Sequence, residues 1–277
     1  MILWCDGDHD PAENMLRDRA LLDRLERGDE REPVLRLFRF APHGITLGAS
    51  QAPERVLDLE RCRREHVPWA VRPTGGRAIF HAEEWTYSLS ARIDDSEWGG
   101  TLREAYARTA RLLIASLLRL GVPVEAAPGA SAGRGVARAT ASAACFASTG
   151  GHELVLAGRK LAGSAQRRLT HAFLQQGSVL LGSGHLRLID YLAVADARRA
   201  QMQSDLRRRT ADAGRWLGDA SLERWADALA SVLTKDGRQP PRRVSAAAGI
   251  VALTPRETAS RARGLPTPPD AARRSAP

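Results

Sequence analysis

The sequence is poor in cysteine and in aromatic residues. Its 277 residues include three cysteines, Cys5, Cys62 and Cys145, which are too few and too widely spaced for a disulfide framework or a zinc site. Aromatic residues make up 5% of the chain, which is little for a surface that stacks on nucleic-acid bases. Zinc-finger, basic-zipper and ribonucleoprotein motifs are also missing. We therefore expect a protein of the reducing cytoplasm that does not recognise nucleic acid.

Long hydrophobic runs and a surplus of acidic residues are missing as well. No stretch approaches the roughly 18 apolar residues of a membrane span, and the acidic segment MILWCDGDHDPAEN lacks the features of a signal peptide. Lys and Arg total 41 against 32 Asp and Glu, which gives a formal charge of +9. We expect no membrane association and a surface that favours acidic partners.

Apolar periodicity predicts helices and short strands that alternate along the chain. The helices are expected at residues 14–27, 53–66, 102–120, 192–212 and 221–233. The strands are expected at 34–40, 45–47, 69–72, 78–81, 86–93, 153–156, 159–161 and 173–181, with an edge strand from 122. Because several of these strands form hairpins, the predicted fold class is α+β.

Composition divides the chain into one domain and a tail. Residues 1–236 are predicted to form one folded domain, with the helices within 192–233 packed on it. Residues 127–144 are rich in Ala, Gly and Ser, which predicts a low-complexity loop. Pro, Arg, Ala and Ser dominate residues 237–277, which predicts a disordered basic tail.

The segment CFASTGGHELVLAGRKLAGSAQ, residues 145–166, carries a pattern suited to acyl transfer. A lone thiol, Cys145, precedes Lys160 by fifteen residues. A thiolate is a good acyl nucleophile, and a lysine ammonium can stabilise the oxyanion of a tetrahedral intermediate. Small residues after the lysine let an acyl chain approach the backbone; they are Gly163, Ser164 and Ala165. A buried structural cysteine and a solvated hairpin lysine are the alternatives.

A second motif, RPTGGRAIFH, occupies residues 72–81. Its glycine pair forms a turn without side chains that would block a ligand, and its arginines can meet a phosphate or an acidic carrier. Its histidine can orient an acyl carbonyl or accept a proton. A simple hairpin turn and a structural histidine are the alternatives. The candidate site residues of this motif are Arg72, Thr74, Gly75, Gly76, Arg77 and His81.

Together the two motifs resemble the biotin/lipoate protein ligase superfamily, and within it the cysteine-dependent octanoyltransferases of lipoate assembly. Further likeness comes from Glu13-Asn14-Met15, from the strand pair 37–51, from Thr86-Tyr87-Ser88 and from residues 175–181. The likeness covers about residues 11–190. It departs at Ala82, where the family often has Asp, and at Gln176, where it often has His. The resemblance implies mixed sheets flanked by helices.

The resemblance also implies an activity, a protein N-octanoyltransferase. Octanoate would pass from octanoyl-acyl carrier protein to Cys145 as a thioester, and then to a lysine of a lipoyl domain, with the glycine-cleavage H protein as the expected acceptor. Lys160 would stabilise the tetrahedral intermediates and His81 would serve in catalysis. The remaining candidate residues would bind the substrate, and neither a metal nor a nucleotide cofactor would be needed.

Three other functions remain open from the sequence. An ATP-dependent lipoate ligase shares the fold, but Arg77 stands where ligases often carry a third glycine, and both Arg77 and Cys145 favour a transferase. An amidotransferase would take its acyl group from a protein lysine. A basic adaptor or nucleic-acid-binding protein is suggested by the arginines within residues 238–274.

Overall fold

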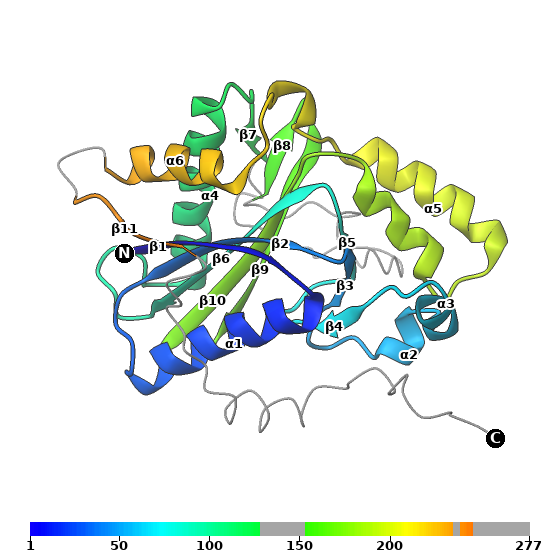
Figure 1. The fold of residues 1–277 in the computed structure, drawn as a ribbon, viewed down its shortest axis with the longest axis horizontal. Coiled ribbons are helices and arrows are strands. Elements are labelled where there is room, and N and C mark those ends of the chain that lie inside the picture. The colour runs from blue at the N-terminus through cyan, green and yellow to red at the C-terminus, as the bar shows by residue number, and fades with distance from the viewer. Residues whose placement is uncertain (128–152, 235–238, 246–277) are drawn as a thin grey trace, which may run out of the picture.

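A mixed sheet of eight strands forms the centre of the molecule (Figure 1). The structure is a computed structural model that describes residues 1–127, 153–234 and 239–245. In spatial order, the strands are β11 (Arg242–Ser245), β1 (Ile2–His9), β2 (Val34–Phe40), β6 (Glu84–Arg92), β10 (Ala172–Leu180), β9 (Arg159–Arg168), β8 (Leu154–Leu156) and β7 (Glu125–Ala126). β1 runs parallel to both of its neighbours, and every other pair in this sheet is antiparallel.

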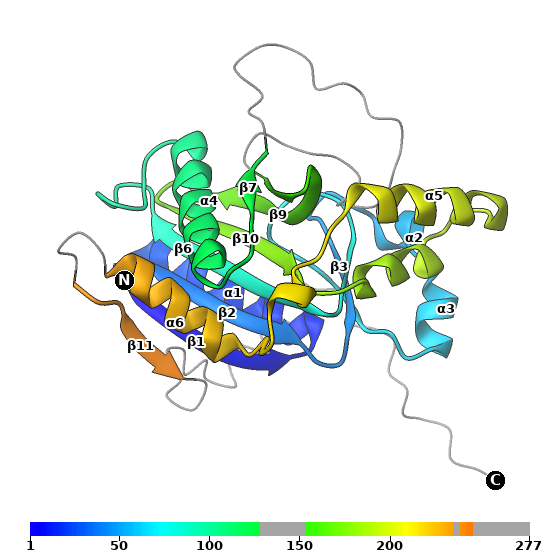
Figure 2. The same ribbon diagram turned by 90° about the horizontal axis from the view of Figure 1, so that it is seen from above.

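Helices cover both faces of the central sheet. Helix α1 (Pro11–Arg27), which connects the parallel strands β1 and β2, packs on one face. Helices α4 (Leu102–Arg119) and α6 (Leu222–Leu233) cover the other face (Figures 1 and 2), where the largest apolar core lies. No helix within the described ranges is both long and apolar enough to cross a membrane.

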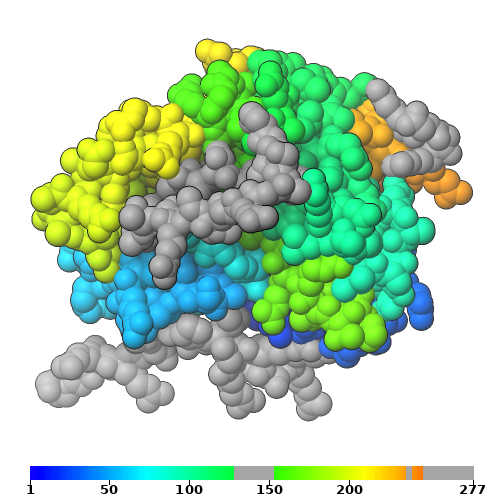
Figure 3. Space-filling view, turned by 180° about the vertical axis from the view of Figure 1, so that it is seen from behind, coloured from blue at the N-terminus to red at the C-terminus, as the bar shows by residue number. Residues whose placement is uncertain are grey.

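A small second sheet stands at one end of the central sheet. It consists of β4 (Trp69–Val71), β3 (Gly44–Leu47) and β5 (Ile79–His81). The elements around it are α2 (Pro53–Val56), α3 (Leu59–Arg64), the 3₁₀ helix η2 (Gly184–Tyr191) and α5 (Asp196–Arg209). A second 3₁₀ helix, η3 (Gly214–Trp216), precedes α6 beside the central core. In the view from behind (Figure 3), α5 and the α2–α3 segment form one side of the molecule and α4 the other.

Local signals explain where the main helices begin and end. The side chain of Asp10 accepts a hydrogen bond from the Glu13 backbone amide, and Gly28 ends α1 with a φ of +80°. Thr101 and Glu104 form a capping box at the start of α4. These signals lie close together in the chain, so sequence reasoning located both helices to within a few residues.

The predicted helix at 53–66 is wrong, because it is two short helices. Between them Leu57 is extended and pairs with Leu192, and its side chain is buried. Asp58 then caps α3 by accepting from the Arg61 backbone amide at 2.9 Å. The pairing of Leu192 likewise shortens the helix predicted at 192–212, which begins at Asp196.

Two strands escaped the sequence prediction. Ile2–His9 forms β1, for which no strand was predicted. Arg242–Ser245 forms β11, which pairs in parallel with Ile2–Cys5. The prediction of disorder from residue 237 onward is therefore wrong for this strand, while residues 246–277 lie outside the described part of the chain. Mixed strands and covering helices confirm the α+β class.

Candidate active site

A narrow cavity of about 30 Å³ lies where the small sheet meets the central sheet. We call it the inner cavity. Five of the predicted site residues line it, although they come from segments far apart in the sequence: Arg72, His81, Gly163, Ser164 and Ala165. Met15 of α1, Phe40 of β2 and Gln176 of β10 close the remaining sides.

The side chain of Arg72 holds residues 72–77, which we call the glycine loop, by hydrogen bonds to the backbone of the loop. Its guanidinium donates to the carbonyl oxygen of Gly75 at 2.8 Å and to that of Arg77 at 2.8 Å. Gly76 has a φ of +95°, and a Cβ there would lie 2.7 Å from the Arg72 guanidinium, so glycine is required. Arg72 therefore shapes the loop that was predicted to bind substrate, and Arg77 contributes its backbone carbonyl while its side chain is half-buried.

His81 is buried and makes hydrogen bonds through both ring nitrogens. Nδ1 lies 2.5 Å from Glu84 Oε1, and Nε2 lies 2.7 Å from Thr46 Oγ1. Since Glu84 Oε1 also accepts from the hydroxyls of Thr86 and Ser178, the proton of the His81–Glu84 pair lies on Nδ1. The ring stacks on Phe40, with centroids 3.8 Å apart. These contacts fix the orientation of His81.

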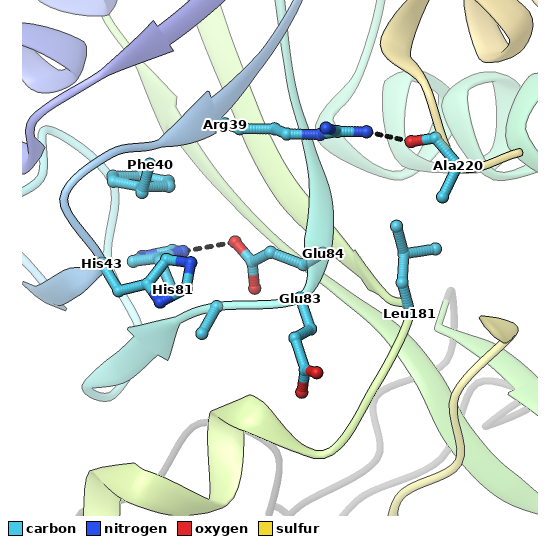
Figure 4. Close-up of a pocket in the computed structure, with 9 residues that line it drawn as sticks. Arg39, Phe40, His43, His81, Glu83, Glu84, Leu181 and Ala220 are labelled. Carbon is cyan, nitrogen blue, oxygen red and sulfur yellow. Dashed lines mark hydrogen bonds and ion pairs between the residues drawn. The ribbon is translucent and has the colours of Figure 1, made fainter.

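A second, larger cavity of about 310 Å³ lies on the other side of His81 (Figure 4). We call it the outer cavity. His81 and Phe40 line both cavities, and Arg39, His43 and Glu84 line the outer one. The guanidinium of Arg39 donates to the carbonyl oxygen of Ala220, which joins β2 to the segment before α6. His81 therefore separates the inner cavity from the outer cavity and lines both.

Lys160 lies at the start of β9, three residues before the part of that strand that lines the inner cavity. Its side chain is 2% exposed, and its ammonium forms an ion pair with the carboxylate of Glu153. Its carbonyl oxygen accepts from the Ala211 backbone amide at 2.9 Å. The solvated hairpin alternative is wrong for this lysine. Lys160 does not line either cavity, so the structure does not bring its ammonium together with His81.

The predicted nucleophile, Cys145, lies outside the described residues, as does most of the predicted loop at 127–144. The other two cysteines are described. Burial raises the pKa of Cys5 to about 11, with a further contribution from Glu223, and burial raises the pKa of Cys62 to about 11. Thiols with so high a pKa are poor nucleophiles at neutral pH.

Sequence reasoning missed a polar cluster between α1 and the sheet. Arg36 alternates with leucines in β2, a pattern typical of a half-exposed strand, yet its side chain is 0% exposed. The guanidinium contacts Asp6 at 2.7 Å, Asp18 at 2.8 Å and Asn14 Oδ1 at 2.6 Å. Burial raises the pKa of Asp6, but the hydrogen bond with His9 and the charge of Arg36 together hold it below its ordinary value.

Glu153 was also missed, although the sequence carried a signal for it. Glu153 and Lys160 flank the predicted hairpin turn at Ala157-Gly158, so the antiparallel pairing of β8 with β9 brings them together. Within the described ranges, no group of three or more His, Cys, Asp or Glu side chains could hold a metal ion.

Comparison with known proteins places the chain in a family. The family model described as "Lipoyl protein ligase A/B catalytic domain" matches residues 10–234. The chain therefore belongs to the lipoyl protein ligase A/B catalytic domain family.

Named relatives narrow the class further. The octanoyltransferase LipM of Moorella thermoacetica is 41% identical over 175 residues, which is 63% of this chain and 63% of that protein. The octanoyltransferases LipM of Exiguobacterium sp. and Halalkalibacterium halodurans are 36% and 31% identical, over 70% and 73% of each chain. The aligned segment thus spans less than two thirds of the Moorella relative. These names support the predicted acyltransferase class.

Solved structures show the same fold. A lipoate-protein ligase A bound with ATP is 18% identical to this chain with a TM-score of 0.65. The superposition covers 95% of this chain and 92% of the ligase chain. A bipartite lipoate protein ligase from Thermoplasma acidophilum is 19% identical with a TM-score of 0.66, over 95% of this chain and 90% of the ligase chain. The predicted superfamily and its fold are confirmed.

Proposed function

We propose that this chain is a protein octanoyltransferase of lipoate assembly. It takes octanoate from octanoyl-acyl carrier protein and places it on a lysine of a lipoyl domain, with the glycine-cleavage H protein as the acceptor. The observation that carries this proposal is the convergence of Arg72, which holds the glycine loop, of His81 and of Gly163–Ala165 on the inner cavity. The octanoyltransferase relatives support the same activity.

The first half-reaction exchanges one thioester for another. The thiolate sulfur of Cys145 attacks the octanoyl carbonyl carbon, and a tetrahedral intermediate forms with a negative oxygen. Its collapse breaks the bond between that carbon and the carrier's sulfur, so the carrier leaves as a thiolate and then takes up a proton. The enzyme retains octanoyl-Cys145.

The second half-reaction forms the amide. The acceptor lysine has a reference pKa of about 10.4, so it must lose a proton before its nitrogen attacks. The new carbon–nitrogen bond forms, the bond to the Cys145 sulfur breaks, and the thiolate is regenerated. The ammonium releases its first proton to solvent, and His81, oriented by Glu84 through Nδ1, accepts the second at Nε2 when that atom leaves Thr46.

Lys160 stabilises both tetrahedral intermediates in this proposal. Its ammonium turns from the Glu153 carboxylate toward the developing oxyanion, where its positive charge stabilises the negative oxygen. The placement of Lys160 on the strand that continues into Gly163–Ala165 supports this role.

Acylation of the enzyme tests the thioester route. The purified protein is incubated with octanoyl-acyl carrier protein and analysed by intact-mass and peptide mass spectrometry. We expect one octanoyl group on Cys145, released by hydroxylamine and absent from C145A, with Cys62→Ala as the matched control that keeps the label. An unlabelled Cys145 in a protein that still transfers octanoate contradicts the route.

Two assays separate the rival activities. Lipoate-dependent exchange of pyrophosphate into ATP identifies a ligase, and we expect none. Transfer from an octanoylated lipoyl domain, without carrier protein, identifies an amidotransferase. We expect the carrier thioester to be the faster donor.

A further inference from the structure

A chain of buried hydrogen bonds connects helix α1 with the glycine loop. The hydroxyl of Thr74 donates to Gln176 Oε1 at 2.7 Å, and Gln176 Nε2 donates to Asp18 Oδ2 at 2.6 Å. All three side chains are buried, and they come from the loop, from β10 and from α1. These two hydrogen bonds thus connect the glycine loop to α1 through Gln176, which lines the inner cavity.

The direction of each bond in this chain is determined by its neighbours. Asp18 Oδ1 already accepts from Arg36 at 2.8 Å and from the Ser88 hydroxyl at 2.7 Å. A carboxylate beside a guanidinium offers only acceptors, so Gln176 must turn its amide nitrogen toward Asp18. Its oxygen then remains for Thr74. No other orientation of the Gln176 amide satisfies both neighbours.

The Thr74 hydroxyl adds a side-chain link to the contacts that the loop makes through its backbone. Arg72 fixes the carbonyls of Gly75 and Arg77, and the Ala49 backbone amide donates to the Thr74 carbonyl oxygen at 2.9 Å. The backbone of Gly75 and Gly76 also packs closely on Gly48, where an added Cβ would lie 3.0 Å or less from both. The Thr74 side chain adds the buried hydrogen bond that ties the loop to β10 of the central sheet.

We propose that Gln176 is a positioning residue that keeps the glycine loop in its binding conformation by linking Thr74 to Asp18. The role of this loop in substrate binding rests on the proposed octanoyl transfer. A loop ordered in advance does not lose conformational freedom when the donor binds, so affinity for the donor depends on this link. Loss of one such hydrogen bond corresponds to about a tenfold change in affinity.

Methionine at position 176 and valine at position 74 remove the link while keeping shape. The first readout is hydrogen exchange of the Ala49 amide, which reports whether the loop opens. We expect exchange about tenfold faster in Q176M and in T74V, and no faster in the double variant, since both substitutions break the same link. Q175M is the matched control, because Gln175 is equally buried on the same strand but contacts Gln166 and Tyr87 instead.

The second readout is steady-state transfer. We expect the KM for the octanoyl donor to rise about tenfold in Q176M and T74V, with kcat changed less than about threefold. A buried threonine on α4, Thr109, provides the activity control as T109V, since its hydroxyl donates to the Ala105 carbonyl oxygen of the same helix. If Q176M does not fold, T74V carries both measurements.

The outcomes separate this proposal from the proposed function. Unchanged Ala49 exchange in T74V and Q176M, or additive effects in the double variant, overturns the positioning role even in an active transferase. A protein that lacks octanoyl transfer but shows coupled loop opening keeps the positioning role and refutes the function. A fall in kcat alone, with the KM for the donor unchanged, also overturns the proposal.

Discussion

Replacement of Arg36 by methionine tests whether the buried polar cluster stabilises the fold. The guanidinium is 0% exposed and lies 2.7 Å from Asp6 and 2.8 Å from Asp18, whose side chains are also 0% exposed. Methionine keeps the apolar stem but leaves Asp18 without its cation, while Asp6 keeps the guanidinium of Arg17 at 2.9 Å. Removing one partner of a buried ion pair costs about 3–5 kcal/mol.

The expected result is a large loss of stability. Urea unfolding at pH 7 should show a free energy of unfolding about 3–5 kcal/mol lower in R36M, and the Tm should fall by about 6–20 °C for a domain of this size. R19M is the matched control, because Arg19 of α1 is 56% exposed and pairs with Asp23 at 3.0 Å. An exposed pair contributes at most about 1 kcal/mol.

The pH dependence checks the electrostatic origin of this loss. The pKa of Asp6 lies below its ordinary value, so its stabilising contribution is present above that ordinary value and is lost as the pH falls through the lowered pKa. Without Arg36 the pKa of Asp6 rises and less stability is lost in acid. The difference between wild type and R36M should therefore narrow from pH 7 toward pH 3. An R36M variant no less stable than R19M, or a difference that widens in acid, refutes the reasoning.

Three further predictions concern the site. K160M should lower the rate of octanoyl transfer by about 10²–10³-fold, and K160R should retain more activity, as measured by initial rates with matched circular dichroism spectra. M15A should remove a wall of the inner cavity, cost about 2–5 kcal/mol of stability, and raise the ratio of decanoyl to octanoyl transfer in a competition assay. Iodoacetamide at pH 8 should alkylate Cys145 far faster than Cys5 or Cys62, because a thiol of pKa about 11 is only about 0.1% thiolate there; labelling of Cys62 at an equal rate contradicts this.

Local patterns predicted the elements whose residues contact one another within a few turns or across a hairpin. The strand at 34–40 was predicted with its bounds, and helix α1 and the strand at 172–180 nearly so. β1 and β11 were missed because their pairing is parallel and joins distant parts of the chain. Single-sequence periodicity carries no information about such a partner.

Sequence patterns predicted some of the residues that line the inner cavity, but not the buried residues that support them. The two motifs supplied five of the residues that line the inner cavity, because they are recognisable as sequence patterns. The buried charge of Arg36 was not recognisable, since its partners lie on β1 and α1 and only the fold brings them together. Gln176 was noted as a departure from the family pattern, but its contacts with Thr74 and Asp18 follow from the packing of three separate elements.

The position of β1 has a consequence for synthesis on the ribosome. One edge of β1 can pair with β2 as soon as α1 has formed. The opposite edge, which pairs with β11, stays unpaired until Arg242–Ser245 has left the exit tunnel. For most of translation, Ile2–Cys5 thus presents unpaired backbone groups that a neighbouring nascent chain could capture. Slow elongation through the segment before residue 242 should therefore lower the soluble yield, while the finished fold stays the same.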